Sequence, residues 1–293
     1  MKRSAIALLI LAIFFSPALA QKINVGASIF PIYDWVRIIG GERVDAFVLL
    51  QPGKSPHTFE LLPQDAERIS KSKAFFVIGK GLETWLENYA RSAGSDAGSI
   101  VRLAEGIDGR LMQIGYSGEL LKDPHLWLDP MAAKIMVARI ADRLCGIDPA
   151  GCDTYKSNLA KYAVVLDQLT KELQNLGSEF RGRKIVTHHN AFRQFLLRSN
   201  GLGLLGVVET SPDQEPSSAH IKELIVAMKA AKVRVVFEEP LLSSREAKII
   251  ASEVGGVVMT LDPIESGPSR DTSYEKLIRY DIDEIRKALT INK

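Results

Sequence analysis

The chain has 293 residues, of which 46% are hydrophobic, 25% charged and 7% aromatic. These values are those of an ordinary globular protein, and they exclude a disordered chain, a collagen-like repeat and a membrane protein with several spans. The formal net charge is only +2.

The first twenty residues have the pattern of a cleavable export signal. The basic start MKR precedes the apolar stretch SAIALLILAIFF, and the sequence PALA then ends in the small-x-small pattern that signal peptidase recognises. An uncleaved membrane anchor is the alternative, but the stretch is shorter than the roughly 20 residues that span a bilayer. We predict a signal peptide over 1–20, cleaved after Ala20, and a periplasmic product.

The mature chain is expected to be neutral. Loss of Lys2 and Arg3 reduces the 37 basic residues to 35, which equals the 35 acidic residues. A neutral surface gives no electrostatic reason to bind nucleic acid or an anionic membrane. No Cys lies near the cleavage point, so we expect a soluble, monomeric protein without a lipid anchor.

Short β-rich apolar segments alternate with helical segments, which is typical of parallel α/β layers. They form two groups of four, which predicts two similar lobes, each with a mostly parallel four-stranded sheet and flanking helices. The predicted strands are Ile23–Ile29, Ala46–Leu50, Ala74–Ile78 and Ile100–Leu103 in one lobe, and Lys184–Thr187, Leu204–Val208, Val233–Phe237 and Val257–Leu261 in the other.

Between the two groups, an amphipathic pattern without Gly or Pro extends from Asp153 to Leu176. Its apolar residues alternate at spacings of four and three, which predicts a helix of roughly 36 Å. We expect this helix to join the lobes and restrict their motion; a surface helix packed on one lobe is the alternative. The predicted organisation is a signal peptide (1–20), an N-terminal lobe (21–152), a connecting helix (153–180) and a C-terminal lobe (181–293).

The two cysteines, Cys145 and Cys152, flank the turn-forming sequence GIDPAG just before this helix. Export to an oxidising compartment favours a local disulfide between them. A zinc-binding pair is the alternative, but the chain has no further Cys to complete a thiolate site.

Four of the five histidines lie in loops or at strand ends. His57 follows the second predicted strand, and His188 and His189 follow the fifth; Asp262 similarly follows the last. Ligand sites in open α/β sheets lie beyond the carboxyl ends of the strands. His125 lies in the sequence DPHLWLDP, where two prolines and an apolar cluster hold it in a fixed orientation.

Three imidazoles and one carboxylate, two from each lobe, would make a closed four-coordinate set suited to Zn²⁺. Spacing alone does not establish that these side chains converge, and a solvated or backbone-bonded His is the ordinary alternative at each position. The chain lacks HExxH, GxSxG and a Cys-His-Asn grouping, which are signatures of common exported hydrolases.

Taken together, these elements resemble the ZnuA/TroA-like solute-binding proteins of zinc and manganese ABC transporters (cluster A-I). The matching segments follow the order of that family across nearly all of the mature chain. They are SIFPIYD (28–34), PHTFE (56–60), GKGLETWL (79–86), DPHLWLDP (123–130), HNAF (189–192), EPS (215–217), EP (239–240) and LDP (261–263).

The resemblance implies two α/β lobes joined by a long rigid helix, with a metal in the cleft between them. Its ligands would be His57, His125, His189 and Asp262. In the family, the ligating His is followed by Asp or Asn, then a small residue and an aromatic one. His189 fits this pattern and His188 does not, so the resemblance implies His189 as the ligand.

Two departures from the family pattern concern the choice of metal. The segment Met112–Lys122 lacks the His-rich loop of many zinc importers, so that loop gives no support for zinc. Manganese members usually carry Glu where this chain has His189, and imidazole-rich ligation favours Zn²⁺ over Mn²⁺. His220 and Glu239 are not expected to be ligands, although Glu239 could orient a ligating His.

The predicted function is therefore capture of a divalent transition metal in the periplasm, with zinc favoured by the ligand types, and its delivery to an ABC permease and its ATPase. No enzyme activity is expected. The alternatives are a manganese- or iron-binding member of the same family and, less favoured, an exported zinc hydrolase with an open coordination position or an adhesin or metal buffer with the same fold.

Overall fold

The computed structural model describes residues 22–93, 99–107, 123–210, 214–240, 242–264 and 272–291. The predicted signal peptide and the segment Met112–Lys122 lie outside these residues. Among the helices that are described, none combines the length and the apolar character needed to cross a membrane.

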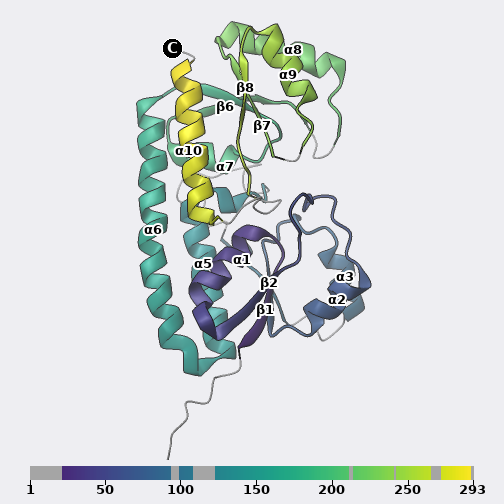
Figure 1. Ribbon diagram of the computed structural model, residues 1–293, viewed down its shortest axis with the longest axis vertical. Coiled ribbons are helices and arrows are strands. Elements are labelled where there is room, and N and C mark those ends of the chain that lie inside the picture. Colours follow the sequence, from purple (N-terminus) through teal and green to yellow (C-terminus); the bar gives the residue numbers. More distant parts are fainter. Residues whose placement is uncertain are drawn as a thin grey trace, which may run out of the picture.

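The described chain forms two lobes, each built on a four-stranded parallel sheet (Figure 1). The strand orders, β2-β1-β3-β4 and β6-β5-β7-β8, are equivalent, so the same fold occurs twice and the predicted fold class is confirmed. The strands are β1 (Ile23–Ala27), β2 (Val44–Val48), β3 (Ala74–Val77), β4 (Ile100–Arg102), β5 (Lys184–Thr187), β6 (Gly203–Val207), β7 (Val235–Glu238) and β8 (Val257–Thr260).

The largest error in strand position is at β2, which begins two residues before the predicted Ala46. Val44 pairs in register with Ile23 and is buried, although the exposed Asp45 interrupts the apolar pattern. The predicted residues Leu49 and Leu50 are also buried, but they lie beyond the end of the strand.

Helices cover both sheets. The N-terminal lobe contains α1 (Phe30–Gly40), α2 (Pro63–Ser70), α3 (Leu86–Ala93) and α5 (Pro130–Ile147), with short 3₁₀ turns at Gly41–Arg43, Leu126–Leu128 and Pro149–Gly151. The C-terminal lobe contains α7 (Arg193–Ser199), α8 (Ser218–Ala231), α9 (Arg245–Glu253) and α10 (Tyr274–Ile291).

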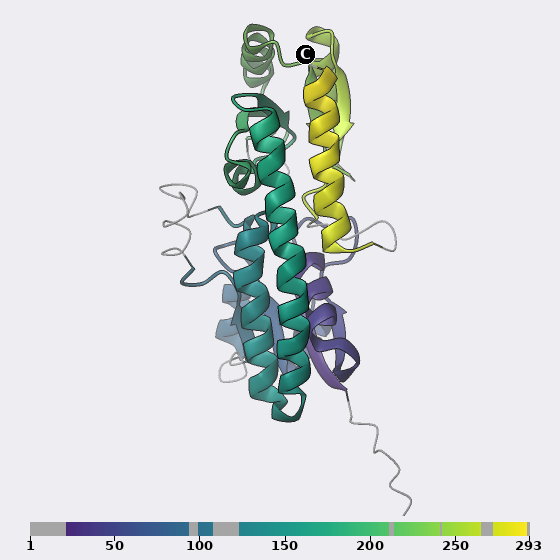
Figure 2. The same cartoon turned by 90° about the vertical axis from the view of Figure 1, so that its left-hand side faces the viewer.

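The connecting helix, α6, extends over Cys152–Glu179 and passes both lobes (Figure 2). It packs against α1 and α5 of the first lobe and against α7 and α10 of the second. Tyr155, Leu166 and Leu176 lie at successive levels of its buried face. The alternative of a surface helix on one lobe is therefore wrong.

A continuous apolar core follows α6 through the molecule. Among the described residues, one buried cluster includes Val25 and Trp35 in the first lobe, Leu169 on α6, and Phe195 and Ile285 in the second lobe. The two sheets are thus connected by packed side chains as well as by the chain itself.

The turn between α5 and α6 is closed by the predicted disulfide between Cys145 and Cys152, whose Cα atoms are 4.5 Å apart. Asp148 in the same turn accepts two hydrogen bonds from Arg43, at 2.7 and 2.9 Å, and a third from the Tyr155 hydroxyl at 2.6 Å. These contacts attach the base of the helical hairpin to the first lobe.

Candidate metal centre

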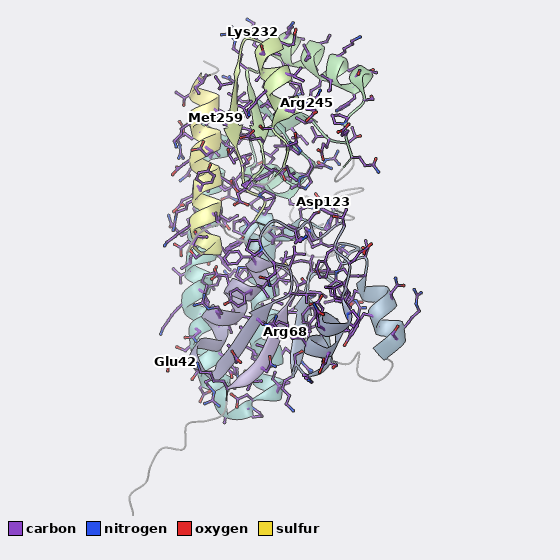
Figure 3. The ribbon with its side chains drawn as sticks, turned by 45° about the vertical axis from the view of Figure 1, so that its right-hand side comes forward. Glu42, Arg68, Asp123, Lys232, Arg245 and Met259 are labelled. Carbon is purple, nitrogen blue, oxygen red and sulfur yellow. A yellow bond between two sulfur atoms is a disulfide. The ribbon has the colours of Figure 1, made fainter. Side chains whose placement is uncertain are left out.

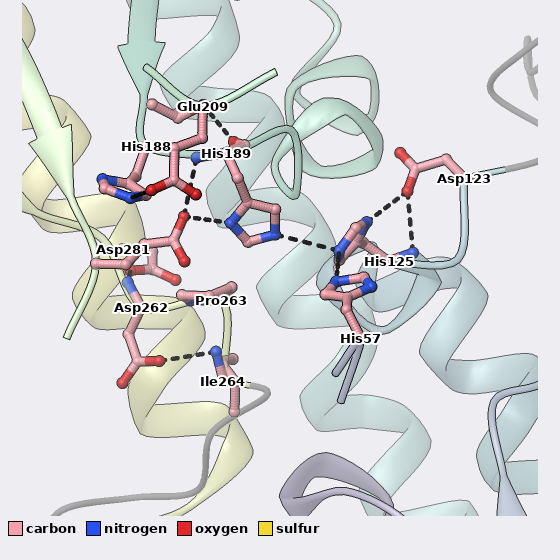
Figure 4. A network of polar contacts seen from close by, with 12 residues as sticks. His57, Asp123, His125, His188, His189, Glu209, Asp262, Pro263, Ile264 and Asp281 are labelled. Atoms are coloured by element: carbon pink, nitrogen blue, oxygen red, sulfur yellow. Dashed lines mark hydrogen bonds and ion pairs between the residues drawn. The ribbon is translucent and has the colours of Figure 1, made fainter. Parts of the chain in front are cut away.

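Three of the four predicted ligands converge between the lobes. His57 lies in the loop after β2, His125 lies in the turn before α5, and His189 lies in the loop after β5 (Figure 4). His125 Nε2 is 3.3 Å from His57 Nε2 and 3.3 Å from His189 Nε2. One ligand atom from each ring lies within 4.8 Å of the others.

These separations fit the dimensions of a zinc site. Zn–N bonds of about 2.0–2.1 Å at tetrahedral angles place neighbouring ligand nitrogens about 3.3–3.4 Å apart. His125 Nε2 lies 3.3 Å from the Nε2 atom of each of the other two rings. Two of the three ring pairs therefore have the nitrogen separation expected around a tetrahedrally coordinated Zn²⁺ ion.

Two carboxylates fix the orientation of two of these rings. Asp123 Oδ1 is 2.7 Å from His125 Nδ1 and also accepts the His125 backbone N–H at 3.0 Å. Glu239 Oε1 is 2.6 Å from His189 Nδ1 and accepts the His189 backbone N–H at 3.2 Å. Because each Nδ1 donates its hydrogen to a carboxylate, each neutral ring presents a lone pair on Nε2, which is the form that binds metal.

Asp123 was not identified from the sequence, although it lies only two residues before His125. The signal was its place at the start of DPHLWLDP, where a carboxylate can bond both the backbone and the ring of the His two residues later. In Figure 3 its side chain lies at the level between the lobes.

The turn that carries His125 is rigid for local reasons. The Leu126 backbone N–H donates to Pro124 O at 2.7 Å, and Leu126 and Trp127 are fully buried. Asp129 accepts the Met131 N–H at the start of α5 and forms a buried bidentate pair with Arg198 of α7, at 2.8 and 2.9 Å. The His125 turn is thereby joined to the helix that follows His189.

The electrostatics of the cluster favour neutral imidazole at His57. Burial, followed by the repulsion between His57 and the other two rings when they are charged, lowers the pKa of His57 to about 3. Burial acts to raise the pKa of Glu239, but the adjacent His189 outweighs it, so that this pKa is lowered and the carboxylate stays ionised.

Asp262 lies beside the cluster but outside the group of converging ligand atoms. Its Oδ1 accepts the Ile264 backbone N–H at 2.8 Å, and its carboxylate points toward Ile264 in Figure 4. Burial raises the pKa of Asp262, and the charge of Glu239 adds to this effect. Its role as the fourth ligand therefore stays a prediction.

The remaining histidines have other surroundings. His188 is fully buried, and its Nε2 lies 3.0 Å from Glu209 Oε1. His220, on α8, bonds through Nε2 to Val207 O at 2.8 Å. The geometry thus places His189, and neither His188 nor His220, beside His125.

The family model described as "Zinc-uptake complex component A periplasmic" (ZnuA) matches residues 25–288. The chain belongs to the ZnuA family. Among curated members, the high-affinity zinc uptake system protein ZnuA of Bacillus subtilis (strain 168) is 27% identical over 287 residues, covering 92% of this chain and 89% of that protein. The manganese ABC transporter substrate-binding lipoprotein PsaA of Streptococcus anginosus is 28% identical, covering 92% and 90%.

Solved structures of ZnuA-like proteins have the same architecture. A crystal structure of ZnuA superposes with a TM-score of 0.79 at 28% identity, covering 92% of this chain and 99% of that chain. The laminin binding protein Lmb of Streptococcus agalactiae, described as an adhesin with metal transporting activity, gives 0.80 at 27% identity, covering 92% and 100%. The two-lobed fold of this ZnuA-family chain is therefore that of its relatives.

Proposed function

We propose that this protein captures Zn²⁺ in the periplasm and delivers it to the permease of an ABC transporter. The observation that carries the proposal is the convergence of three histidines, in which His125 Nε2 lies 3.3 Å from the Nε2 atoms of both His57 and His189, the spacing of ligands around a tetrahedral zinc ion. Family membership supports the transport role, because the matching family is a zinc-uptake component.

In this proposal, His57 and His125 of one lobe and His189 and Asp262 of the other bind the ion. Asp262 would supply the fourth bond by turning its carboxylate from Ile264 toward the three rings. Asp123 and Glu239 would keep His125 and His189 in the metal-binding tautomer.

Zinc is favoured over manganese by the ligand types. Three imidazoles suit Zn²⁺, whereas Mn²⁺ prefers a site richer in oxygen. The manganese-transporting relative is as similar in sequence as the zinc-transporting one, so overall identity does not decide between them. Mn²⁺ is the alternative cargo.

A hydrolytic role has less support. It would need a general base facing a metal-bound water. Asp123 and Glu239 are carboxylates in contact with the converging rings, but each already accepts two hydrogen bonds from its histidine through one oxygen. The family is moreover one of uptake components, so no bond is expected to be made or broken.

The remaining parts of the proposal concern the export of the protein, its oligomeric state, its partner and its lobe boundaries. A signal peptide at 1–20 would export it, and the mature chain would act as a monomer. Its partner would be a membrane permease that opens the cleft or competes for the ion. The division into lobes at 21–152 and 181–293, with 153–180 between them, is part of the same proposal.

Titration calorimetry of the metal-free mature protein tests the proposal. We expect one tight Zn²⁺ per chain, and His57→Ala should weaken binding by about 100-fold or more, because loss of a residue that only orients a ligand already costs about 10–100-fold. His220→Ala, which changes a histidine outside the cluster, is the matched control and should bind zinc normally. No stoichiometric site, or equal effects of the two substitutions, would refute the proposed site.

Competition between Zn²⁺ and Mn²⁺ tests the choice of cargo. We expect Zn²⁺ to displace Mn²⁺ at equal concentrations. The opposite order, together with manganese in protein purified from its own periplasm, would favour the manganese alternative.

A further inference from the structure

The segment that carries Asp262 is bonded to both lobes. Within the second lobe, the Asp262 backbone N–H donates to Asp281 Oδ1 of α10 at 2.8 Å. From the first lobe, the Trp127 indole N–H donates to Pro263 O at 2.6 Å. Trp127 is fully buried and Pro263 is buried, so water does not compete for this bond.

Trp127 belongs to the same turn as His125. The two rings lie 5.2 Å apart, centre to centre. Trp127 makes another hydrogen bond through its backbone, because its carbonyl accepts the Tyr274 hydroxyl at 2.6 Å. The Tyr274 backbone N–H in turn donates to Asp34 of α1 at 2.9 Å. The turn that carries His125 therefore also contacts Pro263 and Tyr274 through Trp127.

The next residue, Ile264, has an unusual backbone conformation. Its φ of +66° lies in the left-handed region, which is unfavourable for a β-branched side chain. Such a conformation persists only where the surroundings impose it. Here Ile264 is buried, Trp127 holds the preceding carbonyl, and Asp262 Oδ1 holds the Ile264 N–H.

We propose that Trp127 is a positioning residue for the fourth metal ligand. Its bond to Pro263 fixes the backbone beside Asp262 in the frame of the lobe that carries His57 and His125. Asp262 would then reach the metal by rotating its side chain away from the Ile264 N–H, while the bond from Trp127 keeps the Pro263 carbonyl in place. This inference rests on the proposed function, in which Asp262 binds the ion.

The hydrogen bond between Trp127 and Pro263 also makes the bond from Asp262 to the metal sensitive to the distance between the lobes. If the lobes separate, the Trp127–Pro263 bond breaks and Asp262 loses its fixed position, while His57 and His125 move together on their own lobe. Release of the metal would then begin with the bond from Asp262 to the ion.

A double-mutant cycle with Zn²⁺ alone as the ligand tests the inference. Trp127→Phe keeps an aromatic ring but removes the indole N–H, and it should lower zinc affinity about 10-fold, as loss of a residue that positions a metal ligand does. In an Asp262→Ala background, where no fourth ligand remains to be positioned, Trp127→Phe should lower affinity less than about 3-fold because positioning residues act through their ligand. The visible absorption of bound Co²⁺ should change similarly in Trp127→Phe and Asp262→Ala.

Trp85→Phe is the matched control, because Trp85 is buried in a separate cluster of the first lobe. It should change neither zinc affinity nor the Co²⁺ spectrum. Equal effects of Trp127→Phe in both backgrounds, or no effect on wild-type affinity, would overturn the inference. Stoichiometric zinc binding by the wild type and its loss in His57→Ala test the proposed function separately.

If Trp127→Phe does not fold, Tyr274→Phe takes its place in the same cycle. This change removes only the hydroxyl that donates to Trp127 O, and an aromatic ring at position 274 still packs against Trp35. A loss of zinc affinity that disappears in the Asp262→Ala background would support the inference. A loss that is the same in both backgrounds, or no loss, would refute it.

Discussion

Replacement of His57 by Asn should make the metal-free protein less sensitive to acid. The pKa of His57 falls from 6.5 to about 3 in the folded protein, chiefly through burial. Because the folded-state pKa is the lower one, the unfolded chain binds a proton first. The contribution of neutral His57 to the free energy of unfolding is therefore complete above about pH 6.5, and it is lost as the pH falls toward 3.

The size of this effect follows from the two pKa values. Between pH 7 and pH 5, protonation of His57 in the unfolded chain alone costs the folded protein about 2 kcal/mol, at about 1.36 kcal/mol per pKa unit. Asn has no such proton to bind. The wild type should therefore lose about 2 kcal/mol more stability over this range than His57→Asn does.

Urea unfolding at pH 7 and pH 5, with a chelator present, measures this difference. His220→Asn is the control, because His220 lies outside the cluster; it should lose as much stability as the wild type. Parallel losses in the wild type and His57→Asn would show that His57 is not held neutral, and would refute the electrostatic account of the site.

Three further predictions concern other parts of the structure. Glu239→Gln, which weakens the bond to His189 Nδ1, should reduce zinc affinity about 10–100-fold in competition with a chelating dye. Arg198→Ala leaves a buried carboxylate unpaired and should destabilise the protein by about 3–5 kcal/mol in urea, whereas Arg279→Ala, at a partly exposed pair, should cost about 1 kcal/mol or less. Replacement of both Cys145 and Cys152 by Ser should cost about 2.5 kcal/mol, the entropy of closing a loop of about eight residues.

The sequence predicted the fold well because its signals are local. Alternation of apolar strands and helices established the α/β class, and the unbroken pattern of α6 established the connecting helix. Strand ends were predicted less accurately. At β2, the exposed Asp45 interrupts the apolar pattern, whereas the pairing of Val44 with Ile23 extends the strand.

The sequence predicted candidate residues for the site but not the contacts between them. His57, His125 and His189 all follow strand ends or rigid turns, which the sequence shows, yet their convergence depends on how two lobes pack together. The bonds from Asp123 and Glu239 to ring nitrogens depend on side-chain orientation, and Glu239 lies 50 positions from its partner. The contact between Trp127 and Pro263 joins positions still farther apart, and no sequence pattern predicts it.

The apolar core that continues from one lobe to the other has a consequence for folding. Val25 of the first sheet and Ile285 of α10 belong to one buried cluster with α6 between them. Separation of the halves would expose that cluster to water, at about 25 cal/mol for each Å² of apolar surface. The two halves should therefore unfold in a single cooperative calorimetric transition, and neither half should fold when it is expressed alone.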